Sequence, residues 1–527
     1  MRLEFGNAKN MNECKLQSEG IPLRNQLVSD KSDSRIRFVR DILYSSLPSI
    51  FNTLKGFLIL PILSKLMGSA TYGIWVQFNV SIMLMLCFTT LNLGHSMSRF
   101  LVGSQPKIRL VKDLNAILFL VFSVEIALGG ILFLSRHALA NFLFGSERHA
   151  VIVTIMATYL PLSAVNNEFM AFLRARRMNR QGALITIGKT TAQLLAVSLV
   201  ALHTSEIVFI LSSFAGVELI TMILLSLYIY FSLFRQYHFK MSFENIPTYL
   251  KFGIPLIPMT LAHWVVQSSD RYVIGYFMNV SQVGIYAVAY TLAGALGVLL
   301  SPVLTVLLPD LSDLYERKQV GELETRFQRI QKYYVAIGSA TTVGLAILAR
   351  PLIKVISSPE FIAGTQPLII LSVAFFFYGL FILYTQLLNV LKAVRLMSFL
   401  WTGLALLNLG ANIILIPIMG LMGAAVSTCL AFLIGAVVSG ISASRSFYLI
   451  FHPKWLAQLG VSLGFMAIIV HFLPHQSFAG LLFAILGGMV VYGMSLKVTG
   501  FVDFKDYHFA KRALLSVFGK CGGVYVN

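Results

Sequence analysis

A small number of charged and amide side chains lie inside segments of this sequence that are otherwise apolar. In such surroundings a cation and a carboxylate can neutralise each other, or either can bind an ion or a charged molecule. Amide side chains add hydrogen-bond donors and acceptors. The cations are Lys55, Lys189 and Arg271, the carboxylates are Glu125, Glu168, Glu218 and Asp270, and the amides include Asn52, Asn79, Asn166 and Asn167.

Helical spacing brings several polar side chains together. Asn52 lies three residues before Lys55, so both project from one face of a helix. Asn408 and Asn412 are four residues apart and share a face, and the following helix returns Thr428 to about the depth of Asn412. Two amides and a hydroxyl supply neutral oxygen ligands of the kind that hard cations such as Na⁺ accept.

Asp270 and Arg271 are neighbours in the chain. Adjacent residues of a helix do not face each other, so we do not expect these two charges to be each other's main partner. At least one of them should reach another helix or a cavity. Asp270 lies roughly 10 Å from the end of its apolar segment, a depth comparable with that of Asn412. We predict a cation site formed by Asp270, Asn408, Asn412 and Thr428; an amide network that joins the helices is the alternative.

The elements that position these side chains are long apolar helices. Hydrophobic residues make up 57% of the chain, charged residues 12%, and the mean hydropathy is +0.77. A helix of roughly 20 apolar residues crosses a bilayer and satisfies its own backbone hydrogen bonds. A charge at the bilayer centre costs roughly 2.5–3.5 kcal/mol, so the internal charges should face a cavity or a partner. We predict an all-α polytopic membrane protein with about fourteen transmembrane helices, at residues 42–65, 71–97, 114–135, 150–173, 183–203, 207–234, 252–277, 283–308, 332–350, 364–391, 398–417, 421–444, 455–473 and 477–496.

The distribution of positive charge predicts the orientation. The net charge is +19, which could indicate a nucleic-acid partner, but the basic residues concentrate in every second connection between the apolar segments. Lys and Arg in short loops remain on the cytoplasmic side, so both termini are predicted to be cytoplasmic, with no nucleic acid bound. Residues 1–34 lack the apolar core of a signal peptide and are predicted to form a disordered tail.

The connections offer little room for an active site. The longest, residues 310–331, mixes charges with scattered apolar residues and predicts an amphipathic helix on the membrane surface; a regulatory or partner-binding helix is the alternative. The sequence has no phosphate-binding glycine loop or catalytic triad motif, and its four cysteines lack metal-ligand spacing. We therefore expect a non-enzymatic protein without cofactors that moves something across a membrane.

The chain also repeats itself weakly. A proline near the start of the first apolar helix, at 47–48, matches one near the start of the seventh, at 254–255, and an aromatic–glycine segment at 72–75 matches one at 284–286. Matched proline-interrupted helices indicate the substrate site of a transporter. We predict two six-helix lobes in parallel pseudo-repeat plus two C-terminal helices: a tail at 1–41, an N-lobe at 42–234, an inter-lobe loop at 235–251, a C-lobe at 252–444, two further helices at 445–497 and a tail at 498–527.

Four segments resemble a known family. They are Phe252–Tyr290, Leu47–Trp75, Leu299–Tyr315 and Asn412–Phe432, and the adjacent Asp-Arg pair in the first is among the more specific signals. The resemblance is to Wzx-like polysaccharide-biosynthesis flippases. Their superfamily, the multidrug/oligosaccharidyl-lipid/polysaccharide exporters, also contains the lipid II flippases and the multidrug and toxin extrusion antiporters.

The resemblance implies a fold and a function. Two six-helix lobes would surround a cavity that opens alternately to each face of the bacterial cytoplasmic (inner) membrane. The cargo would be an undecaprenyl-diphosphate-linked oligosaccharide for O antigen (lipopolysaccharide), capsule or exopolysaccharide, with coupling to Na⁺ or H⁺. Membrane lipids and other polysaccharide-assembly proteins would be partners. A multidrug or metabolite cation antiporter and a membrane-embedded enzyme of polysaccharide synthesis are the alternatives.

A diphosphate cargo assigns roles to the internal polar residues. It requires countercharge and donors in a medium of low dielectric constant. Lys55 and Arg271 lie on the matched first helices of the lobes, so both could meet one diphosphate. The alternative is that each cation neutralises a nearby glutamate. Asn412 stands where related lipid II flippases suggest an acid in the cation site. The expected substrate-binding residues are Lys55, Lys189, Arg271, Asn52, Asn79 and Asn166.

Overall fold

The computed structural model describes residues 20–101, 106–235, 240–449 and 453–502, and these ranges contain helices and no β-strand. Thirteen helical segments within them are long and apolar enough to cross a membrane. The first, Ile50–Thr89, contains two of the predicted spans, because the helix breaks at Gly68 (φ 79°, ψ 179°). The prediction of an all-α membrane protein with about fourteen spans is therefore confirmed.

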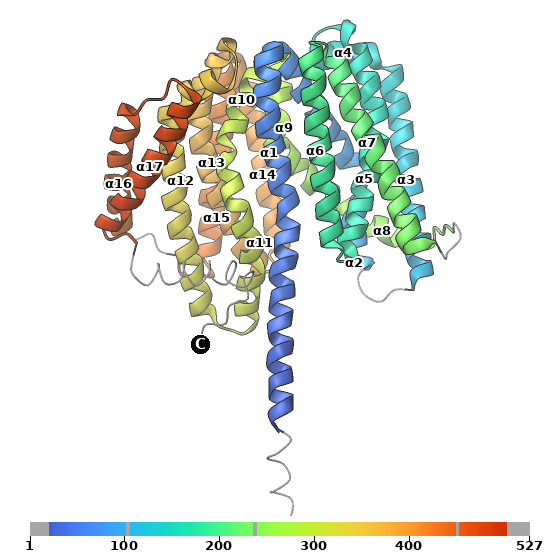
Figure 1. Cartoon of the computed structure of the whole chain (residues 1–527), viewed down its shortest axis with the longest axis horizontal. Coiled ribbons are helices and arrows are strands. Elements are labelled where there is room, and N and C mark those ends of the chain that lie inside the picture. The colour runs from blue at the N-terminus through green and yellow to red at the C-terminus, as the bar shows by residue number, and fades with distance from the viewer. Residues whose placement is uncertain (1–19, 102–105, 236–239, 450–452, 503–527) are drawn as a thin grey trace, which may run out of the picture.

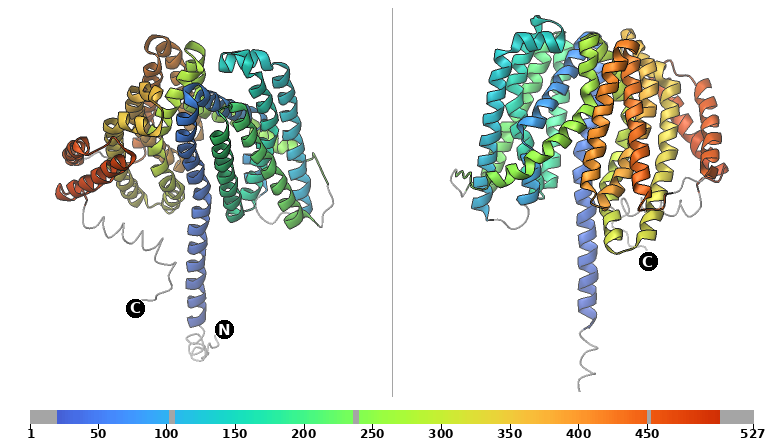
Figure 2. Two further views of the ribbon diagram at one scale, coloured as in Figure 1. Left: turned by 45° about the horizontal axis from the view of Figure 1, so that its top comes forward. Right: turned by 180° about the vertical axis from the view of Figure 1, so that it is seen from behind.

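The helices form two lobes with α1 between them (Figures 1 and 2). The N-lobe contains α1 Gly20–Thr89, α2 Leu93–Phe100, α3 Lys107–Leu134, α4 Arg136–Phe144, the 3₁₀ turn η1 Glu147–His149, α5 Ala150–Ala175, α6 Asn179–His203, α7 Ile207–Ile229 and the π turn η2 Tyr230–Phe234. Helix α8 Ile246–Gly253 packs against α2 and α3 of the N-lobe, and η3 Ile254–Leu256 leads from it into the C-lobe (Figure 1). The C-lobe contains α9 Ile257–Phe277, α10 Val280–Ala293, α11 Ala295–Glu316, α12 Val320–Ile356, η4 Pro359–Gly364, α13 Thr365–Val390, α14 Val394–Met419 and α15 Leu421–Ser444. Two further helices, α16 Pro453–Phe472 and α17 Phe478–Val498, pack against α12 at the edge of the C-lobe.

The same helix pairs pack together in both lobes. In the N-lobe α1 contacts α6, α3 contacts α5, and α7 contacts both α5 and α6. In the C-lobe α9 contacts α14, α12 contacts α13, and α15 contacts both α13 and α14. This correspondence confirms the predicted parallel repeat of six helices, followed by two additional ones.

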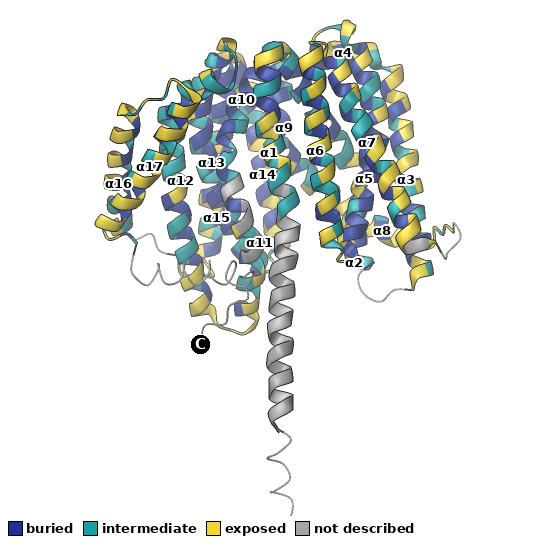
Figure 3. Ribbon diagram, viewed as in Figure 1, coloured by how far each residue is buried: buried dark blue, intermediate teal, exposed yellow. Residues whose placement is uncertain are grey.

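Many large apolar side chains lie on the surface of the bundle, and several polar and charged side chains are buried within it. Figure 3 shows how the exposed and buried residues are distributed over the helices. Large side chains such as Leu202, Phe399, Phe472 and Val498 are largely exposed. Lipid is the medium that suits such a surface. The buried polar residues therefore identify the interior positions at which binding chemistry can occur.

The N-terminal segment differs from the expectation. Helix α1 begins at Gly20 and projects beyond the bundle, so the prediction of a disordered segment is wrong for residues 20–34 (Figure 1). Pro22 lies in the first turn, where no intrahelical hydrogen bond is lost, and the helix continues into the first apolar segment. Residues 1–19 and the C-terminal residues 503–527 lie outside the described ranges.

Residues 310–331 also differ from the expectation. They form no surface helix, because α11 continues to Glu316 and α12 begins at Val320 after a tight turn. Arg326 of α12 pairs with Asp310 of α11 and with Glu322, each at 2.6 Å. The charges of this segment thus hold two antiparallel helix ends together instead of facing lipid headgroups.

The two lobes are joined at the end that carries α4 and η4. Here Gly73 of α1 and Gly284 of α10 meet: a Cβ on Gly73 would lie 1.9 Å from the Val280 carbonyl oxygen, and one on Gly284 would lie 2.2 Å from the Ser69 carbonyl oxygen. Ser69 and Val280 each precede their glycine by four residues, so the contact is reciprocal, as at a two-fold axis. The aromatic–glycine segments that signalled the repeat are therefore its meeting point.

A carboxylate from the C-lobe reinforces this contact. Glu360 of η4 accepts hydrogen bonds from the Ser69 backbone N–H at 3.0 Å and from the Ser69 hydroxyl at 2.6 Å. The Ser69 hydroxyl also lies 2.6 Å from the Ser281 hydroxyl. Because the helix restarts at Ser69 after the Gly68 break, Glu360 satisfies one of its free backbone donors. The lobes are thus closed on each other at this end.

Glycine at position 284 is predicted to be necessary for this closure. In the double variant Ser69→Cys/Ser281→Cys the two sulfurs should form a disulfide readily, because the native hydroxyls are in contact. Adding Gly284→Ala should slow the cross-linking about tenfold or more, because the new methyl group collides with backbone. Gly130→Ala, at a glycine with open space around it, is the control. Equal cross-linking rates in the Gly284 and Gly130 variants would contradict this description of the contact.

Candidate functional site

A polar cavity of about 380 Å³ lies in the N-lobe between α1, α5, α6 and α7. It extends from Phe214 and Gln193 to Met178 and Asn179, at the connection between α5 and α6. This is the end of the bundle that carries α2, opposite the closed contact at Gly73 (Figure 1). The lining includes five of the six residues that the sequence suggested for substrate binding: Asn52, Lys55, Asn79, Asn166 and Lys189.

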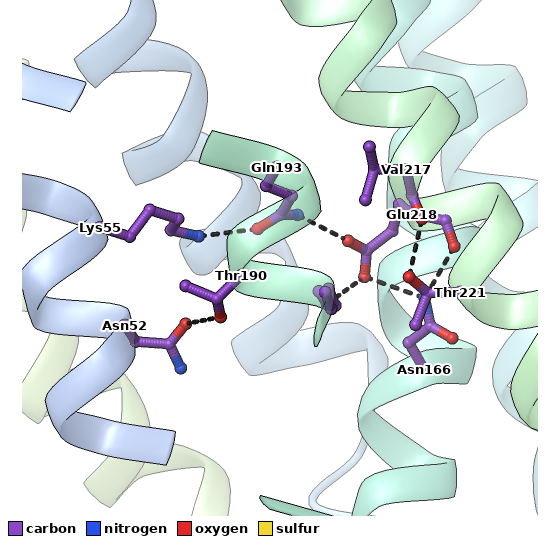
Figure 4. A network of polar contacts seen from close by, with 9 residues as sticks. Asn52, Lys55, Asn166, Thr190, Gln193, Val217, Glu218 and Thr221 are labelled. Carbon is purple, nitrogen blue, oxygen red and sulfur yellow. Dashed lines mark hydrogen bonds and ion pairs between the residues drawn. The ribbon is translucent and has the colours of Figure 1, made fainter. Parts of the chain in front are cut away.

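Side chains of α1 and α6 meet across this cavity (Figure 4). The Lys55 ammonium group donates to Gln193 Oε1 at 2.8 Å, and the Thr190 hydroxyl donates to Asn52 Oδ1 at 3.1 Å. The three-residue spacing of Asn52 and Lys55 places both on the face of α1 that looks toward α6, as predicted. Lys55 also lies 5.4 Å above the centre of the Phe214 ring.

Glu218 of α7 is the centre of the network. Its carboxylate is fully buried and accepts three hydrogen bonds, from Lys189 Nζ at 2.6 Å, from Gln193 Nε2 at 3.1 Å and from Asn166 Nδ2 at 3.0 Å. Glu218 thus forms an ion pair with Lys189, the arrangement that the structural alternative expected for that residue. Lys55 instead contacts the neutral amide of Gln193.

The charges that line the cavity are of one sign. Lys55, Lys189 and Arg174 are among the lining residues, and no carboxylate of the described residues is. Glu218 lies behind the wall and pairs with Lys189, and Arg174 interacts with Glu168 of α5. Lys55 is the lining cation whose hydrogen bond goes to a neutral amide, and the field of such a charge is weakly screened where water is scarce.

Arg271 and Asp270 lie apart from this cavity, inside the C-lobe. Arg271 Nη1 contacts Asp270 Oδ1 at 2.8 Å, so the prediction that these neighbours are not main partners is wrong. The flexible arginine side chain folds back along the helix, and the same Asp270 oxygen accepts the Arg271 backbone N–H at 2.9 Å. The guanidinium group also lies 3.8 Å from the centre of the Tyr290 ring, so one of the pair does reach another helix, as expected.

The other three residues of the predicted cation site lie together between α14 and α15. Asn412 donates to Asn408 at 3.1 Å, and Asn408 donates to Thr428 at 3.5 Å. Tyr286 lies near both Thr428 and Asp270, but its hydroxyl has no hydrogen-bond partner among the described residues. Asp270 Oδ2 and Asn412 Oδ1 are buried without hydrogen-bond partners among the described residues. The described residues contain no cluster of His, Cys, Asp or Glu that could hold a metal ion.

Residues 62–364, more than half of the chain, match the model of a protein family described as polysaccharide biosynthesis protein. The chain belongs to this family. It is 23% identical over 261 residues to the probable low-salt glycan biosynthesis flippase Agl15 of Haloferax volcanii; the match covers 48% of this chain and 54% of that protein, about half the length of this relative.

Two groups of solved structures have the same fold as this polysaccharide-biosynthesis family member. The lipid II flippase MurJ in an inward closed conformation superposes with a TM-score of 0.71 at 16% identity, over 87% of this chain and 98% of that one. An inward-facing multidrug resistance MATE family transporter gives a TM-score of 0.61 at 13% identity, over 77% and 98%. The chain is thus a multi-pass membrane protein with the fold shared by these transporters.

Thr190, Gln193 and Arg174 at this cavity were missed in the sequence. Gln193, which joins Lys55 to Glu218, lies four residues after Lys189, so the helical spacing could have identified it. Arg174 directly follows the predicted helix at 150–173 and begins a basic run, yet its side chain lines the cavity. A long side chain at a helix end can turn inward as readily as outward.

Glu218 is predicted to be essential for the stability of the N-lobe. Glu218→Ala leaves the charge of Lys189 without its partner and should lower the free energy of unfolding by about 3 kcal/mol. Adding Lys189→Met should recover part of the loss, because the unpaired charge is removed. Chemical unfolding of the purified protein measures both, with Glu206→Ala, on the surface before α7, as the control. If Glu218→Ala unfolded like the control, Glu218 would not be the centre of the network.

Proposed function

We propose that this protein is a flippase that moves an undecaprenyl-diphosphate-linked oligosaccharide across the bacterial cytoplasmic membrane for surface polysaccharide assembly. The observation that carries this proposal is the N-lobe cavity with Lys55, Lys189 and Arg174 in its lining and no carboxylate among the described lining residues. Membership of the polysaccharide biosynthesis family and the flippase fold support it.

The contacts of the two lysines suggest different roles. Lys55 is held by a neutral amide, which it can exchange for a phosphate oxygen without leaving a carboxylate unpaired. Lys189 stays bound to Glu218 and adds positive potential at the cavity wall. Asn52, Asn79 and Asn166 supply amide groups around the same space. A diphosphate would thus gain one direct cation contact and several hydrogen bonds.

The closed contact supports an orientation and a direction of movement. The connections at the α2 end carry the basic residues, so this end would face the cytoplasm and both termini would lie there. The cargo would enter the cavity from that side while Gly73 and Gly284 hold the opposite end shut. Separation of these two glycines and opening of Ser69 from Glu360 would then expose the cavity to the outer face.

The C-lobe cluster would couple this movement to a cation gradient. Asp270 Oδ2 and Asn412 Oδ1 are the free buried oxygens, and Na⁺ or a proton at this place would compete with Arg271 for Asp270. Release of Arg271 from Asp270 would make its guanidinium group available to the diphosphate. A single carboxylate with amide and hydroxyl ligands is a weak site, consistent with reversible binding.

Lys55→Ala should stop export and leave the lipid-linked oligosaccharide on the inner leaflet. The change removes the cation that is free to contact the diphosphate, so transport should fall about tenfold or more. Accessibility of the lipid-linked sugar to an external probe measures this in cells that make the variant at normal abundance. Lys65→Ala, at an exposed position of the same helix, is the control. Normal delivery by Lys55→Ala, or lost drug resistance in place of lost export, would favour an antiporter of the MATE type.

Asp270→Asn should remove the dependence of transport on the ion gradient while the protein remains inserted. The amide keeps the size of the side chain but loses the negative charge that a cation requires. Transport into vesicles with imposed Na⁺ or proton gradients measures the effect, and Asp313→Asn, at an exposed carboxylate of α11, is the control. A variant whose transport still follows the gradient would show that the ion binds elsewhere.

A further inference from the structure

A second cavity, of about 360 Å³, lies beside the first at the α2 end of the N-lobe. Its wall is formed by the end of α1, by α2 and α5, and by Thr260 of α9 in the C-lobe. Asn167 and Arg174 line both cavities, so the two spaces are neighbours divided by these side chains. The polar lining consists of Thr90, Asn92, His95, Ser98, Asn167, Glu168, Arg174 and Thr260.

The second cavity differs from the first because its lining contains a carboxylate, that of Glu168. The residue is 2% exposed, and its carboxylate lies at the first turn of α2, where the backbone of Gly94 contacts it. The carboxylate still has hydrogen-bonding capacity to spare, because its Oε2 atom has no hydrogen-bond partner among the described residues. A buried carboxylate oxygen without a partner is costly, and a ligand hydroxyl that donates to it would remove that cost.

The distribution of charge separates two kinds of ligand group. The first cavity has cations and no carboxylate among its described lining residues and suits a phosphate. The second contains both Glu168 and Arg174, whose charges offset each other, next to amides and hydroxyls that both donate and accept hydrogen bonds. A neutral group rich in hydroxyls matches this lining. Apolar side chains such as Met83 and Leu86 on the opposite wall suit the C–H faces of a sugar ring.

We propose that the second cavity is a saccharide subsite, in which Glu168 accepts a hydrogen bond from a hydroxyl of the cargo's sugar nearest the diphosphate. The inference rests on the proposed flippase function and deepens it. The shared wall of Asn167 and Arg174 lies where the sugar–phosphate bond passes from one space to the other. Thr260 makes the subsite depend on both lobes, so the sugar contributes to closing them around the cargo.

The test compares two ligands that differ only in the sugar. Binding of undecaprenyl diphosphate and of the same lipid carrying the cell's own oligosaccharide is measured on the full chain in lipid nanodiscs. Glu168→Gln should weaken binding of the sugar-bearing lipid at least about tenfold, the loss of one hydrogen bond to a charged group, and leave the sugar-free lipid unchanged. Lys55→Ala should weaken binding of both lipids.

Two further variants make the result specific. Thr260→Val, on the opposite lobe, should also weaken only the sugar-bearing lipid. Glu125→Gln changes another fully buried glutamate of the N-lobe, which bonds Thr89, and should alter neither affinity. Equal effects of Glu168→Gln on the two lipids, or no effect on either, would overturn the subsite. If the unchanged protein bound neither lipid, the proposed function itself would fail and the subsite with it.

Discussion

The structure depends on the free energy required to hold a charge away from water. Every charged side chain inside the bundle must find a partner or line a cavity, and the fold supplies both. Glu218 gathers three donors around one carboxylate, and Asp270 receives Arg271. Lys55 contacts the neutral amide of Gln193 and the ring of Phe214, and it is the cation that we propose binds the ligand. Stability and binding therefore share one set of contacts.

The two lobes use the same packing for different chemistry. In each lobe the fifth and sixth helices of the repeat are joined by polar side chains, Lys189 and Glu218 in one case and Asn408 and Thr428 in the other. The N-lobe cavity has lysine and arginine side chains in its lining, whereas Asp270 and Asn412 of the C-lobe have buried oxygens without hydrogen-bond partners among the described residues. The glycines at the meeting point of the lobes allow the two backbones to approach there without side chains between them.

Features of the fold that depend on segment length, periodicity and charge distribution could be predicted from the sequence. The apolar segments and the matched motifs were sufficient for the helices and the repeat, and helical spacing was sufficient to place Asn52 with Lys55. The prediction for Asp270 and Arg271 was wrong because helical spacing gives the positions of their Cα atoms. It does not show that the long arginine side chain bends back to its neighbour. The prediction for residues 310–331 was also wrong, since an amphipathic pattern fits a surface helix and a helical hairpin equally well. The cavity walls could not be predicted, because they combine helices distant in the sequence.

A structure of the full chain with undecaprenyl-diphosphate-linked oligosaccharide bound would test most directly whether the N-lobe cavity binds the diphosphate. We predict that the diphosphate lies in the N-lobe cavity, with a phosphate oxygen within hydrogen-bond distance, about 3 Å, of the Lys55 ammonium group. In that structure Gln193 would have released Lys55 and kept its contact with Glu218. A diphosphate bound outside the N-lobe, with Lys55 still bonded to Gln193, would contradict the proposal that Lys55 binds the diphosphate in the N-lobe cavity.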